Sequence, residues 1–136
     1  MDKKFVVGNS VKPVLLSAAE MIVTNIHENT INGKSTYICT CVWFFGPDLN
    51  SEEFPQDSLR RCKRNVYVMD EKPVLGDSVK LIARGPEMAV INIQEGIIDG
   101  KSTYIYECQW FFGPKFYSGK FPEDSLKLFR KRRKSN

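Results

Sequence analysis

The stretch of sequence that decides the fold occurs twice: Ser35–Pro47 reads STYICTCVWFFGP and Ser102–Pro114 reads STYIYECQWFFGP. Each copy is rich in β-branched and aromatic residues and ends at a Gly-Pro turn, which is typical of a long β-strand. Aligning residues 21–63 with residues 88–130 gives 24 identities in 43 positions. The offset of 67 residues (88 − 21) is too long for a solenoid repeat and indicates a duplicated small domain.

The turns around this stretch predict short antiparallel strands. Asn32-Gly33 and Asp99-Gly100 are typical of two-residue hairpins, because both central residues of a type I′ turn need positive φ. Residues 55–59 and 122–126 begin with Pro and end with Leu, which predicts one helical turn ahead of short last strands at 60–62 and 127–129. No segment has a sustained helical period.

Five short strands with one helical turn before the last are the plan of an SH3-like barrel. The sequence therefore predicts an all-β protein made of two tandem SH3-like barrels related by internal duplication. The boundaries are residues 1–64 for the first barrel, 65–129 for the second and 130–136 for a basic C-terminal tail. We expect Trp43 and Trp110 to anchor the two interiors.

Residues 76–126 carry the motifs G-D-S-V-K-L, G-P-E-M-A-V, C-Q-W-F and F-P-E-D-S-L. This segment resembles the YodC-like family of small uncharacterised bacterial proteins. The resemblance implies a compact SH3-like barrel and brings no catalytic residues with it. The first copy resembles the family less well, because Ala18-Ala19 replace Gly85-Pro86. More distantly, the barrel is similar to KOW and Tudor-type modules, which bind nucleic acid or modified peptides, although one fold hosts many functions.

Composition and charge limit the functional classes. No apolar run approaches the roughly 18 residues of a membrane span, and the first ten residues lack a signal-peptide core, so we expect a cytoplasmic protein without a membrane partner. Four cysteines and one histidine, His27, offer no recognisable zinc spacing, so no metal or cofactor is predicted. The cysteines are instead expected to be small buried thiols in a reducing compartment.

Catalysis is not expected. A hydrolytic triad needs a base beside a nucleophile, but the only histidine, His27, is replaced by Gln94 in the second copy. Neither copy contains a Gly-rich phosphate loop of the Walker or Rossmann type. The shared acids Asp57 and Asp124 precede Ser-Leu and are interpreted as turn residues. The sequence thus predicts a non-enzymatic protein with no small-molecule substrate.

Basic residues close both copies of the repeat. The formal charge of +4 is concentrated in residues 130–134, RKRRK, which carry +5, so the rest of the chain is close to −1. Several cations along one track favour phosphate binding, because each neutralised phosphate releases counterions. The alternatives are a solvated terminus that keeps the protein soluble and a targeting or membrane-surface role. The candidate nucleic-acid-binding residues, for RNA or DNA, are Arg60, Arg61, Lys63, Arg64, Lys115, Lys127, Arg130, Lys131, Arg132, Arg133 and Lys134.

Aromatic residues provide the other candidate surface. Strand alternation places Trp43 and Phe45 on one face and Phe44 on the other, with Trp110, Phe112 and Phe111 arranged in the same way in the second copy. The outward phenylalanines pack against the neighbouring barrel or a second chain, form a platform for stacked bases or a peptide groove, or are ordinary exposed apolar surface. The candidate contact residues are Phe44, Phe111, Phe116 and Tyr117. The second copy is favoured as the binding one, since Lys115-Phe116-Tyr117 replace Asp48-Leu49-Asn50.

Overall fold

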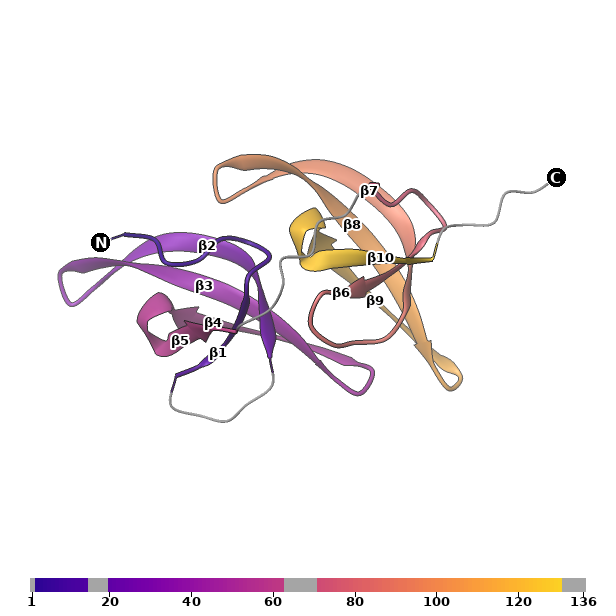
Figure 1. Ribbon diagram of the computed structural model, residues 1–136, viewed down its shortest axis with the longest axis horizontal. Coiled ribbons are helices and arrows are strands. Elements are labelled where there is room, and N and C mark those ends of the chain that lie inside the picture. Colours follow the sequence, from indigo (N-terminus) through magenta and orange to yellow (C-terminus); the bar gives the residue numbers. More distant parts are fainter. Residues whose placement is uncertain (1, 15–19, 63–70, 131–136) are drawn as a thin grey trace.

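A computed structural model describes residues 2–14, 20–62 and 71–130. Two five-stranded antiparallel sheets lie side by side, the first from the N-terminal half and the second from the C-terminal half (Figure 1). The predicted all-β class is confirmed. The elements are β1 (Ser10–Pro13), β2 (Met21–Ile31), β3 (Lys34–Phe45), β4 (Asp48–Pro55), η1 (Gln56–Ser58), β5 (Leu59–Arg61), β6 (Ser78–Leu81), β7 (Met88–Ile98), β8 (Lys101–Phe112), β9 (Lys115–Pro122), η2 (Glu123–Ser125) and β10 (Leu126–Arg130).

The two sheets correspond strand for strand. Their orders are β4-β3-β2-β1-β5 and β9-β8-β7-β6-β10, reading the second from its β9 edge. Each has a register shift at the same place, between Val23 and Asn25 in β2 and between Val90 and Asn92 in β7. The predicted hairpin turns are confirmed, because Asn32 and Asp99 have φ of 53° and 52° and each is followed by a glycine of positive φ.

Each predicted helical turn is a short 3-10 helix. In both, the serine hydroxyl donates to the preceding proline carbonyl, at 2.8 Å from Ser58 to Pro55 and 2.7 Å from Ser125 to Pro122. The leucine that follows, Leu59 or Leu126, is buried in its own core. The last strands begin at these leucines, one residue earlier than expected, and β10 includes Arg130, which pairs with Ser78.

The two hydrophobic cores differ in how well they are covered. Trp110 is only 2% exposed and packs with Phe121 and Leu126 in the second core. Trp43, at the equivalent position, is only partly buried at the edge of the first core. The second core also includes Ile22 and Val42 of the first sheet. The first sheet thus contributes to the second core, whereas the first core, among the described residues, is built only from the first half.

This contact between the sheets, which we call the inter-sheet joint, is made by Phe44, Pro47 and Leu49 near the β3–β4 turn. The Phe44 ring meets the Trp110 ring edge to face at 5.2 Å, and the indole Nε1 donates to the Pro47 carbonyl at 2.7 Å. A methyl group at Gly119 would lie 3.1 Å from Cδ2 of Leu49, so Leu49 sits directly on β9. An edge-to-face aromatic contact, a hydrogen bond and close packing thus join the sheets.

A second link between the halves involves the N-terminal segment. The Lys3 ammonium lies 2.7 Å from Oδ2 of Asp99, in the turn between β7 and β8. Gly8 has φ of 98°, and a Cβ there would lie 2.6 Å from the backbone oxygen of Asp124 in η2. Only glycine allows both this backbone conformation and this approach.

Replacing Gly8 with alanine is therefore expected to destabilise the protein by about 2–4 kcal/mol, combining left-handed strain with a backbone clash. Gly33→Ala is the matched control, because Gly33 has φ of 78° but no heavy atom within 4 Å of a built Cβ. Urea denaturation of both variants checks the difference. Equal losses would mean that the approach of Gly8 to Asp124 contributes nothing to stability.

Candidate interaction surface

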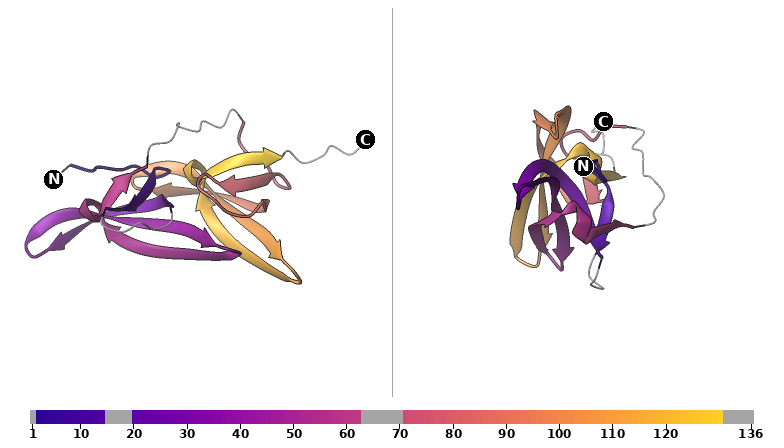
Figure 2. Two further views of the ribbon diagram at one scale, coloured as in Figure 1. Left: turned by 60° about the horizontal axis from the view of Figure 1, so that its bottom comes forward. Right: turned by 90° about the vertical axis from the view of Figure 1, so that its left-hand side faces the viewer.

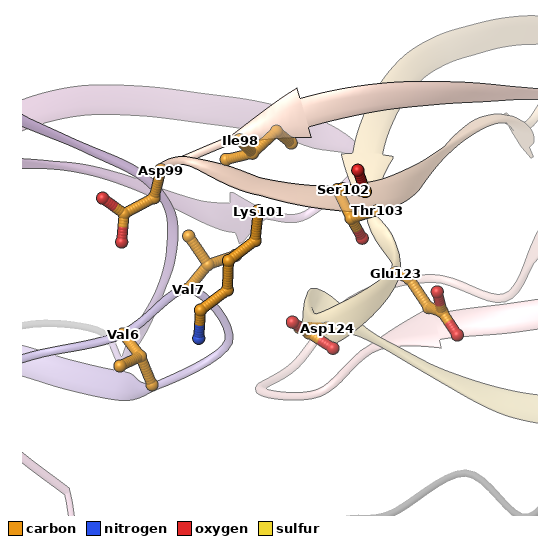
Figure 3. Close-up of a pocket in the computed structure, with 9 residues that line it drawn as sticks. All are labelled: Val6, Val7, Ile98, Asp99, Lys101, Ser102, Thr103, Glu123 and Asp124. Atoms are coloured by element: carbon orange, nitrogen blue, oxygen red, sulfur yellow. The ribbon is translucent and has the colours of Figure 1, made fainter.

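A small crevice lies between the N-terminal segment and the second sheet (Figure 3). Its volume of about 230 Å³ is below the roughly 300–1,000 Å³ of typical ligand pockets. Asp99 is already paired with Lys3, and no cluster of three metal-ligating side chains occurs in the described parts of the chain. The crevice is the space left beside the contacts of Lys3 with Asp99 and of Gly8 with Asp124. Its lining consists of Val6, Val7, Ile98, Asp99, Lys101, Ser102, Thr103, Glu123 and Asp124.

Three of the four cysteines are buried and have unreactive thiols. Burial raises the pKa of Cys39 to about 11 and those of Cys41 and Cys108 to about 12. A thiol with so high a pKa carries almost no thiolate at neutral pH, and the thiolate is the nucleophile. These residues act as small core side chains, and Cys41 and Cys108 occupy the same position of the repeat.

Two of the predicted phosphate-binding arginines are engaged within the protein. Arg61 donates to the Lys4 carbonyl at 3.2 Å and to Oδ1 of Asn9 at 3.0 Å. Arg130 donates from Nε to Glu87 at 2.9 Å, and this guanidinium lowers the pKa of the Glu87 carboxyl. Both side chains are therefore held in place by internal partners.

Arg60 and Lys127 lie at equivalent places, each directly across from another cation. Arg60 faces Lys12 on β1, and Lys127 faces Lys80 on β6. Like charges directly opposite on a sheet are destabilising, so each pair would gain from a bound anion. The remaining predicted cations of the two clusters, Lys63, Arg64, Lys131, Arg132, Arg133 and Lys134, lie outside the described residues.

The predicted aromatic residues separate into two groups. Phe44 lies in the inter-sheet joint, and Tyr117 is partly buried with its ring stacked on Trp110 at 5.9 Å. In contrast, Phe111 and Phe116 are 71% and 63% exposed, with ring centroids 6.0 Å apart. Equivalent strand positions, Phe44 and Phe111, thus have opposite environments.

Phe112 was missed as a surface residue. Alternation placed it with Trp110 on the core face, but it is 62% exposed. It is the last residue of β8, beyond Gln109, where the pairing with β7 ends and β8 pairs with β9 alone. Its position immediately before Gly-Pro is the signal that could have identified it.

Together, Phe111, Phe112, Lys115 and Phe116 form what we call the aromatic tip. The β8–β9 hairpin that carries it projects from the second sheet away from the first (Figure 1 and left view of Figure 2). Exposed aromatic rings beside a cation can pack into an apolar seat on a protein, or stack with bases. No helix in the described residues is long and apolar enough to cross a membrane.

Residues 74–126 match the model of a family described as an uncharacterized small protein (DUF2158). The match covers most of the second sheet and begins after the first. It supports the expected resemblance to a family of small uncharacterised proteins. No curated protein and no solved structure matches the chain.

Proposed function

We propose that each sheet is an SH3-like barrel and that the two arose by duplication of one YodC-like unit. The common strand order, the register shift at the same position and the 24 identities in 43 aligned residues support this. In the first sheet, β1 pairs with both β2 and β5, so the beginning and end of the unit lie together. β6 does the same with β7 and β10.

The function that we propose for the pair is non-enzymatic protein interaction through the aromatic tip. Free thiols at all four cysteines support a cytoplasmic, reducing location. The observation that carries the proposal is the exposure of three phenylalanines at one end of one hairpin. Phenylalanine is enriched in protein interfaces, and a cluster of exposed aromatic rings is typical of an interaction site.

The same place in the first sheet already acts as a contact surface. Phe44 is the counterpart of Phe111, and it is packed against Trp110 and Phe121 of the other half of the molecule. The sequence of this hairpin end is thus suited to docking on a protein surface. The corresponding hairpin end of the second sheet, the aromatic tip, is exposed.

A capture experiment tests this proposal. The full chain is immobilised and exposed to nuclease-treated lysate of the source cells, beside the variants Phe111→Ser/Phe116→Ser and Phe45→Ser. Phe45 is the matched control because it is 79% exposed at the end of β3. We expect the wild type and the control to retain the same proteins and the double variant to lose them. Identical retention by all three would contradict the proposal.

A second candidate function is binding of RNA or DNA. The two cross-strand cation pairs favour it, Arg60 with Lys12 and Lys127 with Lys80. Binding through these pairs would neutralise phosphates and weaken steeply with salt. The same capture without nuclease measures it, as nucleic acid that is recovered at low salt and released as the salt concentration rises.

A further inference from the structure

We infer that the aromatic tip of one chain docks on the first sheet of a second copy, against Trp43 and Phe54, and that chains associate head to tail. This inference rests on the proposed interaction function and names its partner. The internal arrangement supplies the geometry. Within one chain, the β3–β4 hairpin end of the first sheet is seated on Trp110 and Phe121 of the second. The intermolecular contact continues this interface from one molecule to the next.

The first sheet has an equivalent seat without an occupant in the described residues. Trp43 and Phe54 occupy the places of Trp110 and Phe121 in the repeat, and both are partly exposed. Their counterparts are covered, at 2% and 0% exposure. The inter-sheet joint makes this difference, because Phe44 packs on both Trp110 and Phe121.

A specific hydrogen bond follows from the comparison. The indole Nε1 of Trp110 donates to the carbonyl of Pro47 in the docked hairpin end. Among the described residues, no carbonyl oxygen of the other half accepts a hydrogen bond from the indole of Trp43. The counterpart of Pro47 is Pro114, in the turn of the aromatic tip. We expect the Trp43 indole of one copy to donate to the Pro114 carbonyl of the next.

The charges at the proposed contact between copies are complementary. Between copies the docking hairpin end carries Lys115, and the receiving strand, β4, carries Glu52 and Glu53. All three are exposed residues. Such pairing steers association and fixes which end meets which.

The contact between copies differs from the internal one in ways that weaken it. Ala89 and Gln109 replace Ile22 and Val42, which pack on the second core from the first sheet. Glu52 replaces Gly119, on which Leu49 sits. A smaller apolar patch predicts association that depends on concentration rather than a permanent dimer. The aromatic tip and the seat at Trp43 and Phe54 are different surfaces, so repeating the contact from copy to copy gives an open chain of molecules or a ring.

Sedimentation equilibrium of the purified, nucleic-acid-free full chain tests the inference. We expect the apparent mass to rise with concentration in the wild type. The charge reversals Glu52→Lys/Glu53→Lys and Lys115→Glu should each weaken association about tenfold or more, because like charges then face each other. An equimolar mixture of the two variants should regain association, since each tip then meets a seat of opposite charge. Thermal melts of both variants confirm that they fold.

The control is Glu28→Lys/Glu95→Lys, a reversal of exposed charges on β2 and β7, which should associate like the wild type. A wild type that stays monomeric overturns the inference, and if lysate proteins are still captured through the tip, the proposed function survives. Association that Glu52→Lys/Glu53→Lys leaves unchanged would mean that β4 does not receive the tip, and this result overturns the inference as well. Association that nuclease treatment removes is bridging by nucleic acid, and this result also overturns the inference.

Discussion

Phe44→Ala is expected to destabilise the protein by about 2–4 kcal/mol, whereas Phe111→Ala is expected to cost less than about 0.5 kcal/mol. The two residues occupy the same position of the repeat and undergo the same chemical change. Only their surroundings differ. Phe44 lies against Trp110 and Phe121, while Phe111 is 71% exposed.

The physical reason is the cavity that the smaller side chain leaves in the inter-sheet joint. Phe44 comes so close to the backbone of the loop between β6 and β7 that a Cβ on Gly85 would lie 2.4 Å from its Cδ2. Removing the ring also uncovers Trp110, whose indole then loses its edge-to-face partner.

Urea denaturation followed by tryptophan fluorescence measures both free energies of unfolding. Low protein concentration keeps association out of the measurement. Phe111→Ala is the matched control for fold and handling. If the two variants lose equal stability, or if Phe44→Ala loses none, the packing of Phe44 in the joint does not stabilise this protein.

Raising the pH from about 9 to about 11 is expected to remove several kcal/mol of stability. Burial raises the pKa of Cys41 and Cys108 to about 12 and that of Cys39 to about 11. In the unfolded chain these thiols titrate near 8.5. Burial also raises the pKa of the Tyr106 hydroxyl, from its ordinary value near 10 to about 12.

The sign follows from proton binding. Between the unfolded and folded pKa values, the native protein keeps its thiol protons while the unfolded chain has lost them. The unfolded state therefore binds fewer protons, and the free energy of unfolding falls as pH rises, by up to about 1.4 kcal/mol per pH unit for each thiol. Below the unfolded pKa the stabilisation is fully present, and the loss ends only above about pH 12.

Urea midpoints measured in steps of pH test this expectation. Cys41→Ala/Cys108→Ala is the matched comparison, because it removes two of the three buried thiols while keeping small apolar side chains in both cores. Its stability should decline less steeply with pH than that of the wild type, although its starting value is lower. Parallel curves for the two proteins would show that the thiols do not control alkaline unfolding.

The strands and turns could be predicted because their causes are local. Asn32-Gly33 and Asp99-Gly100 fix the hairpins through positive φ, and Pro at 55 and 122 starts the 3-10 turns. The cation clusters could also be found from the sequence, by counting charges. The internal partners of these cations could not be predicted, because the contacts of Arg61 with Asn9 and of Arg130 with Glu87 join segments that are far apart in the sequence.

The sequence by itself therefore determined a β-protein with two matching halves, since alternation and turn chemistry act over a few residues. Only the tertiary structure decided that the halves are used unequally. The two hairpin ends share the run WFFGP, at 43–47 and 110–114, yet one is packed against Trp110 and the other is exposed. The reason is geometric: when one unit docks on another through two different surfaces, one copy of each surface is always left uncovered.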